Sequence, residues 1–123
     1  MVNKQQQFGQ DGESLAAKLL KKHGYKIIEQ NYRTKLGEID IIAKDKDTLV
    51  FVEVKARSSN RIAYSKWAIT PNKQRKISMV ALYYLKATNQ SNVKARFDVV
   101  AISYPHDNPE IEIIKNAFEL AYQ

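Results

Sequence analysis

Two hydrophobic segments with ionisable residues in their interiors constrain this sequence most. Residues 37–43 read GEIDIIA, and residues 49–57 read LVFVEVKAR. Burying an unpaired charge costs enough free energy that carboxylates rarely interrupt runs this rich in Ile and Val. Side chains alternate between the two faces of a strand, so Glu53 and Lys55 project from the same side. If Asp40 lies on the neighbouring strand, three ionisable groups converge on an otherwise apolar sheet.

A convergence of two carboxylates and a lysine is typical of sites that cleave phosphodiester bonds with magnesium. Mg²⁺ takes oxygen ligands and is usually bound through one or two carboxylates, with waters completing its shell. We expect Asp40 and Glu53 to bind Mg²⁺, or Mn²⁺, together with the main-chain carbonyl of Val54. We expect Lys55 to orient the attacking water and to neutralise charge on the phosphate. The alternative is structural: a Glu53–Lys55 ion pair at a sheet edge, with Asp40 in solvent.

The rest of the sequence predicts one α/β domain over residues 1–123, with residues 1–8 flexible. The chain is long enough for a core without staples, and it contains no cysteine. Thr70 and Pro71 have the pattern of an N-cap and first position of a helix, and Gly24 suits a helix C-cap. The order predicts a sandwich of helices around a central mixed β-sheet. We expect helices at about 9–23 and from 71, strands at 25–29, 39–44, 48–57, 96–103 and 111–115, a loop at 104–110, and a tail or helical turn at 117–123.

Two polar residues share the inward-facing stripes of these helices. Glu13 lies one turn before Ala16 on the first helix, and Gln74 precedes Ile77 on the second. Both would find partners beside a metal or a cluster of charges. Taken alone, each also has an ordinary explanation. Glu13 could be stabilised by the helix dipole, and Gln74 could be a boundary residue with its amide in solvent.

The charge distribution favours a polyanionic partner. The formal net charge is +7, and basic residues are concentrated after the second hydrophobic segment. Trp67 lies among them, either to stack on a base or to fill the core. Residues 1–7 are polar and no segment is long and apolar enough for a membrane span, so we expect a cytoplasmic protein. The candidate nucleic-acid-binding residues are Arg57, Arg61, Lys66, Lys73 and Arg75.

The chain resembles a known family over most of residues 8–102. Asp40 followed by Glu53-Val54-Lys55 resembles the PD-(D/E)xK signature of restriction endonuclease-like nucleases, and the whole chain resembles the YraN family of small bacterial proteins, which is assigned that fold. Two features depart from the pattern: no proline precedes Asp40, and residues 60–65 lack a Phe-Gly pair. The matching pieces are Gly12-Glu13, Ala16, Gly24-Tyr25, Asn31-Tyr32-Arg33, Gly37-Glu38-Ile39-Asp40, Val50–Arg57, Lys73-Gln74 and Arg96–Val100.

The resemblance implies a restriction endonuclease-like sandwich with an active centre of Glu13, Asp40, Glu53 and Lys55, supported by Gln74. Two functions remain open. One is a metal-dependent nuclease acting on structured or branched nucleic acid, with DNA favoured over RNA and a homodimer as the possible assembly. The other is a non-catalytic nucleic-acid-binding module on a nuclease scaffold. The sequence lacks a GxSxG motif, a Walker glycine loop and a Rossmann fingerprint, which disfavours triad hydrolases, NTPases and dehydrogenases.

Overall fold

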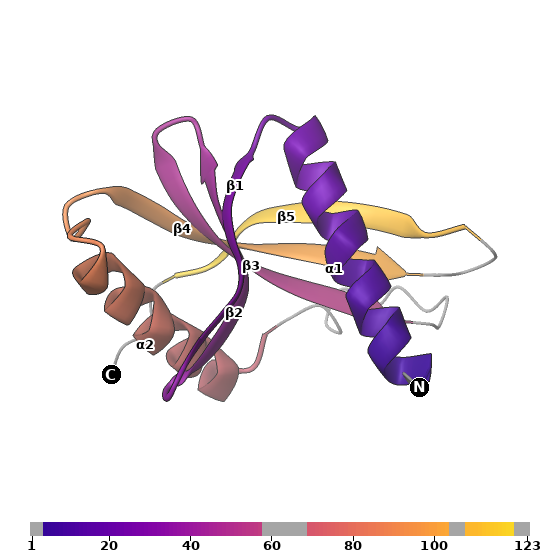
Figure 1. The fold of residues 1–123 in the computed structure, drawn as a ribbon, viewed down its shortest axis with the longest axis horizontal. Coiled ribbons are helices and arrows are strands. Elements are labelled where there is room, and N and C mark those ends of the chain that lie inside the picture. The colour runs from indigo at the N-terminus through magenta and orange to yellow at the C-terminus, as the bar shows by residue number, and fades with distance from the viewer. Residues whose placement is uncertain (1–3, 58–68, 104–107, 120–123) are drawn as a thin grey trace.

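A five-stranded mixed sheet with a helix packed on each face forms the molecule (Figure 1). The computed structural model describes residues 4–57, 69–103 and 108–119, with side chains from Gly12 onward and without that of Arg57. The α/β class, the mixed sheet and the flanking helices are as the sequence predicted. The elements are α1 (Lys4–Lys22), β1 (Lys26–Thr34), β2 (Gly37–Asp45), β3 (Thr48–Arg57), α2 (Pro71–Ala87), β4 (Lys94–Ser103) and β5 (Glu110–Phe118).

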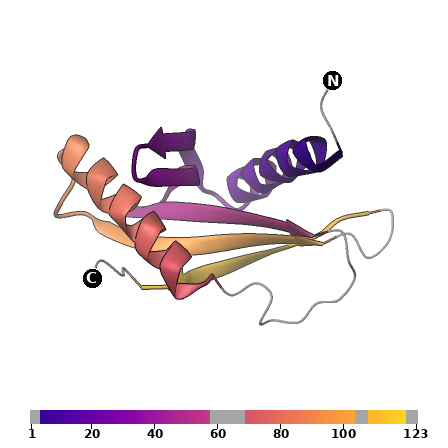
Figure 2. The same ribbon diagram turned by 90° about the horizontal axis from the view of Figure 1, so that it is seen from below.

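The strands lie in sequence order across the sheet. β1, β2 and β3 form an antiparallel meander, β3 and β4 pair in parallel, and β5 returns antiparallel to β4. A parallel pair needs a long crossover, and α2 lies within the connection between β3 and β4. Figure 2 shows α1 and α2 well apart, with α2 running diagonally across the long strands.

Each face of the sheet has its own hydrophobic core. The stripe of α2 packs against one face, where Phe51, Tyr84 and Phe97 are buried, and α1 packs against the other, where Leu20 and Val52 are buried. Strands covered on both faces are expected to be apolar on both sides, which is the pattern of β3 and β4. The apolar stripe of α2 is buried, and its residues are Ile77, Val80, Ala81, Tyr84 and Leu85.

The predicted helix ends are also confirmed. The Thr70 side chain accepts a hydrogen bond from the Lys73 main-chain nitrogen at 3.2 Å, and Pro71 follows at the first helical position. Gly24 has φ +89°, a left-handed conformation that glycine adopts without strain, and the Tyr25 nitrogen donates to the Leu20 carbonyl at 2.9 Å.

The largest differences from the sequence prediction are at three boundaries. α1 begins at Lys4, not near Gly9; β1 continues to Thr34; and β5 continues to Phe118, where we expected a tail or helical turn. β1 and β5 are edge strands with mostly exposed side chains, so their polar sequences carry little hydrophobic alternation. Residues 1–3 of the segment expected to be flexible, and residues 104–107 of the predicted loop, lie outside the described residues. Within the described part, no helix is long and apolar enough to cross a membrane.

Candidate functional site

Asp40 and Glu53 come together where β2 and β3 separate. The antiparallel register of these strands extends from Asp45 opposite Thr48 to Ile41 opposite Val52. Asp40 and Glu53 are the next residue on each strand. There the Val54 main-chain nitrogen donates to Oδ2 of Asp40 at 2.8 Å. A carboxylate therefore takes a hydrogen bond that a main-chain carbonyl accepts in a regular ladder.

The regular alternation of β2 is interrupted at Asp40. Ile39 packs in the core beneath α2, whereas Ile41 packs in the core beneath α1, although residues two apart on a regular strand share a face. On β1, the register places Asn31 across from Asp40, and Asn31 has φ +55°. Asparagine tolerates this left-handed conformation better than most residues. Both strands are thus distorted at the acidic residue, a feature that hydrophobic periodicity does not reveal.

The environment of Asp40 disfavours its ionised form. Burial and the nearby Glu53 carboxylate together raise the pKa of Asp40 to about 7, while the hydrogen bond from Val54 opposes the shift. The Glu53 side chain is itself only 10% exposed. Two carboxylates this close repel each other unless a cation offsets their charge.

Glu13 brings a third carboxylate toward Asp40 from α1. Burial raises the pKa of Glu13, and the charges of Asp40 and Glu38 raise it further, while a hydrogen bond with Asn31 lowers it. The preceding Gly12 lets the helix approach the sheet closely, since a Cβ there would lie 3.2 Å from Cβ of Ala56. The structure therefore places Glu13 beside Asp40, where the sequence predicted it.

Two lysines, Lys55 and Lys73, differ in how they are placed relative to the carboxylate pair. Lys55 lies two residues after Glu53 on β3, on the same face and partly buried. Among the described residues, it makes no ion pair. Lys73, which we expected to bind nucleic acid, places its Nζ 3.3 Å from Oε2 of Glu53. In the part of the chain that the structure describes, the cation that forms an ion pair with the acidic pair therefore comes from α2 and not from the Glu-x-Lys strand.

The other predicted site residues are less closely tied to the carboxylates. The side-chain amide of Gln74 donates to the Ile69 carbonyl at 2.7 Å, so it braces the start of α2. Arg75 is exposed on α2. The side chain of Arg57, and all of residues 58–68, lie outside the described part. The predicted roles of Arg57, Arg61, Lys66 and Trp67 therefore stay predictions.

The oxygen atoms of this site suit a hard divalent cation that takes only a few of its ligands from the protein. Within the described residues, no three His, Cys, Asp or Glu side chains are arranged to hold a metal ion. The oxygens that would hold such an ion are those of Asp40, Glu53 and the main-chain carbonyl of Val54, and Glu13 would lie outside the direct ligands. Mg²⁺ and Mn²⁺ suit such a set, because they accept two carboxylates and complete their shells with water and substrate oxygens.

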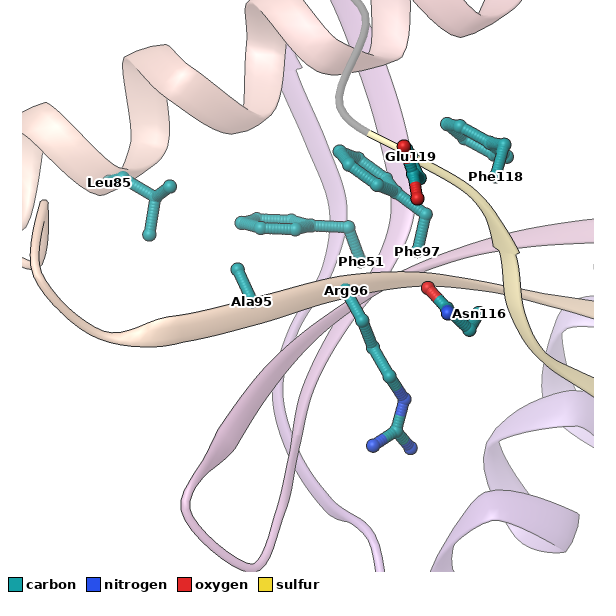
Figure 3. A pocket seen from close by; sticks show the side chains of 8 residues that line it. All are labelled: Phe51, Leu85, Ala95, Arg96, Phe97, Asn116, Phe118 and Glu119. Carbon is teal, nitrogen blue, oxygen red and sulfur yellow. The ribbon is translucent and has the colours of Figure 1, made fainter.

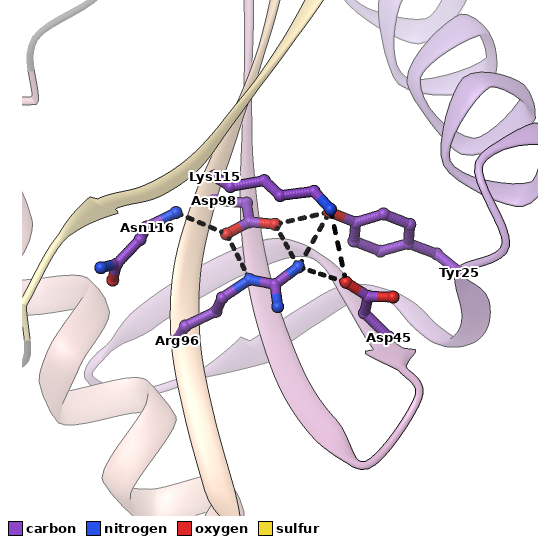
Figure 4. A network of polar contacts seen from close by, with 6 residues as sticks. All are labelled: Tyr25, Asp45, Arg96, Asp98, Lys115 and Asn116. Carbon is purple, nitrogen blue, oxygen red and sulfur yellow. Dashed lines mark hydrogen bonds and ion pairs between the residues drawn. The ribbon is translucent and has the colours of Figure 1, made fainter.

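A second acidic cluster surrounds Asp98 on β4 (Figure 4). Asp98 is fully buried and accepts hydrogen bonds from the Tyr25 hydroxyl at 2.9 Å, from Nε of Arg96 at 3.0 Å and from the main-chain nitrogen of Asn116 at 2.9 Å. Nη2 of Arg96 also donates to Oδ2 of Asp45 at 2.7 Å, which lowers the pKa of Asp45. Burial disfavours the charge on Arg96, but its carboxylate partners outweigh burial and raise its pKa. Burial, together with the contact to Asp98, raises the pKa of Tyr25 to about 12.

The cation that pairs with Asp98 comes from the same strand. Nε of Arg96 lies 3.0 Å from Oδ1 of Asp98, while Arg33 pairs with Glu38 at 2.9 Å. Arg96 and Asp98 are two residues apart on β4 and share a face. The same alternation that linked Glu53 to Lys55 could have identified this pair from the sequence.

A small apolar pocket of about 160 Å³ lies between β4, β5 and the end of α2 (Figure 3). The rings of Phe51, Phe97 and Phe118 line it, while the Arg96 side chain leaves β4 on the other side. The acidic pair and the two lysines beside it are not part of its lining. It therefore belongs to the hydrophobic core and is separate from the acidic pair.

Fold and site together define a small single-domain α/β protein with one buried and one partly buried carboxylate where neighbouring strands separate. The chain belongs to UPF0102, described as an uncharacterised protein family, whose model matches residues 12–102. It is 54% identical to a UPF0102 protein of Desulfosudis oleivorans, over 97% of this chain and 95% of the relative. It is 52% identical to one of Syntrophus aciditrophicus, over 93% and 90% of the two chains, and 51% identical to one of Geobacter metallireducens, over 93% of each. This confirms the YraN-like resemblance.

Proposed function

We propose that this protein is a metal-dependent nuclease that cleaves phosphodiester bonds of structured or branched nucleic acid, with DNA as the preferred substrate. The observation that carries the proposal is the pairing of Asp40 with Glu53 at the point where β2 and β3 separate. Burial and mutual repulsion raise the pKa of Asp40 to about 7, which is costly in a purely structural site. A divalent cation would remove that cost.

Each residue of the site has a definite task in such a reaction. Asp40 and Glu53 would hold the cation, and a bound cation would supply stabilisation of the negative charge that develops on the phosphodiester. Lys55, on the same face of β3 as Glu53, orients the attacking water and neutralises the phosphate. Glu13 contributes a further carboxylate beside Asp40 that holds water near the site. The Val54 nitrogen, through its hydrogen bond at 2.8 Å, fixes the orientation of Asp40.

The second candidate is a nucleic-acid-binding module that uses this scaffold without cutting. The Lys73–Glu53 ion pair favours it, because a protein cation already offsets part of the carboxylate charge. The net charge of +7 supports binding under either proposal. A cytoplasmic location and a homodimer stay predictions.

Cleavage assays separate the two candidates. Labelled branched, single-stranded and duplex DNA, and the matching RNAs, would be incubated with Mg²⁺, Mn²⁺ or EDTA. The nuclease proposal expects metal-dependent products from the parent and at least about a hundredfold slower cleavage by Asp40→Asn and Glu53→Gln. The matched control is Asp47→Asn, which changes a carboxylate that is 77% exposed. Salt-sensitive binding without products under any condition would contradict the nuclease and support the binding module.

A further inference from the structure

The Lys73–Glu53 ion pair joins α2 to the strand that carries the candidate site. Lys73 is in the first turn of α2, where its main-chain nitrogen donates to the Thr70 cap. Its Nζ lies 3.3 Å from Oε2 of Glu53. The Lys73 side chain is 51% exposed and that of Glu53 is 10% exposed, so the cation reaches from the surface onto a buried carboxylate.

The position of Lys73 on α2 is unusual for a lysine. The N-terminus of a helix carries partial positive charge, which favours acidic residues and disfavours cations. The first turn of α2 contains no acidic residue and does contain Lys73. The nearby Glu53 supplies the negative charge that offsets this repulsion. Lys73 is therefore held at this position by the acidic centre.

We propose that Lys73 is a built-in counter-cation that occupies Glu53 until a divalent cation displaces it. This inference rests on the proposed function, because it concerns the same carboxylates. Lys73 and a divalent cation carry like charges and need the same carboxylate oxygens, so their binding to Glu53 is competitive. Once displaced, the Lys73 side chain lies at the surface beside the site and becomes available to a phosphate. Lys73 is thus a positioning residue whose contact with nucleic acid depends on the metal.

A purely structural ion pair predicts something else. A half-exposed pair contributes little to stability, and its loss would leave metal affinity unchanged. If Lys73 organises the site for the metal, its removal would weaken metal binding. Competition alone predicts tighter metal binding after removal of Lys73. The sign of the change in affinity therefore distinguishes the three roles.

The first test measures Mn²⁺ binding by titration calorimetry in the absence of nucleic acid. We expect Lys73→Gln to lower the Mn²⁺ Kd by about three- to tenfold, because this factor corresponds to the free energy of a partly exposed ion pair. Lys73→Arg, which keeps the charge, should bind Mn²⁺ much as the parent does. The control is Lys86→Gln, an exposed lysine at the other end of α2, whose Kd should stay within about twofold of the parent value. Thermal unfolding without metal verifies that each variant is folded.

The second test measures binding to a cleavage-resistant phosphorothioate duplex at several salt concentrations. In the parent, Mn²⁺ should steepen the slope of the logarithm of the binding constant against the logarithm of salt concentration by about one unit, the value for one additional phosphate contact. In Lys73→Gln, Mn²⁺ should leave this slope unchanged. If the parent binds Mn²⁺ and the Kd of Lys73→Gln is unchanged or higher, the proposed displacement of Lys73 by the metal is overturned, while the nuclease proposal stays intact. A parent that binds no divalent cation would overturn both.

Discussion

Two acidic clusters on one sheet have opposite electrostatic designs. Asp98 is enclosed by donors: a tyrosine hydroxyl, an arginine and a main-chain nitrogen. Asp40 receives one main-chain hydrogen bond and faces a second carboxylate, and its pKa rises to about 7. The first cluster is complete without any ligand, while in the second a single half-exposed lysine, Lys73, pairs with Glu53 and offsets only part of the negative charge.

The difference teaches that burial alone does not identify a functional acid. A fully satisfied carboxylate is typical of a structural network, and one left beside another carboxylate is a candidate for ligand binding. The two clusters should therefore respond to substitution with opposite signs. Removing a member of the Asp98 network should destabilise the fold, and neutralising Asp40 should stabilise it.

The largest effect is expected from Arg96→Met. Asp98 is fully buried, so removal of Arg96 leaves a buried charge without its cation. We expect the free energy of unfolding to fall by about 3–5 kcal/mol, measured by chemical denaturation at pH 7. Lys94→Met, on the same strand with a side chain 77% exposed, is the control and should change stability by less than about 0.5 kcal/mol. If Arg96→Met lowers the free energy of unfolding by no more than Lys94→Met does, the Asp98 network is not a structural unit.

The second prediction concerns Asp40→Asn, which should stabilise the protein in a pH-dependent way. Because the pKa of Asp40 is raised in the folded state, folding favours its protonated form, and ionisation costs stability as pH rises from the ordinary value of 3.8 to about 7. The asparagine side chain would keep an acceptor for the Val54 nitrogen and would lack the charge. Without divalent ions, the variant should be equal to the parent near pH 4 and about 1–2 kcal/mol more stable at pH 8.

Thermal unfolding of the two proteins from pH 4 to 8 measures this difference. Asp47→Asn serves again as the exposed control and should show no such trend. A stability gain that is independent of pH, or a loss at pH 8, would remove the electrostatic contrast between the clusters.

The smallest effect on stability is expected from Arg75→Gln. Arg75 is exposed near the start of α2 and belongs to neither cluster. Its replacement should leave the free energy of unfolding within about 0.5 kcal/mol of the parent. Its expected effect is on binding: the salt dependence of nucleic-acid affinity should lose about one unit of slope. Fluorescence anisotropy at several salt concentrations measures it, and an unchanged slope would exclude Arg75 from the binding surface.

Much of this arrangement follows from local sequence rules. Alternation placed Glu53 and Lys55 on one face of β3, and Thr70 and Pro71 fixed the start of α2 to the residue. The pairing of Asp40 with Glu53 followed from two adjacent strands joined by a short turn. These predictions needed only periodicity, capping and neighbouring strands.

The remaining features depend on the tertiary structure. The left-handed conformation of Asn31 and the broken alternation at Asp40 arise where three elements meet, so no single segment encodes them visibly. The Lys73–Glu53 pair depends on how α2 is oriented on the sheet. The edge strand β1 was predicted too short because its hydrogen bonds to β2, and not its own hydrophobic pattern, define it.

The sequence separations of the two clusters have a consequence for the order of folding. Asp40 and the Val54 nitrogen are 14 residues apart within one hairpin, whereas Tyr25 and Asp98 are 73 residues apart. Closing the longer loop costs about 1.5 kcal/mol more chain entropy by the logarithmic rule. We therefore expect the hairpin that carries the acidic pair to form early, and the Tyr25–Asp98 contact to form only when β4 joins β3. Contacts of long sequence separation slow folding, so the network that stabilises the native state most would also be the last to assemble.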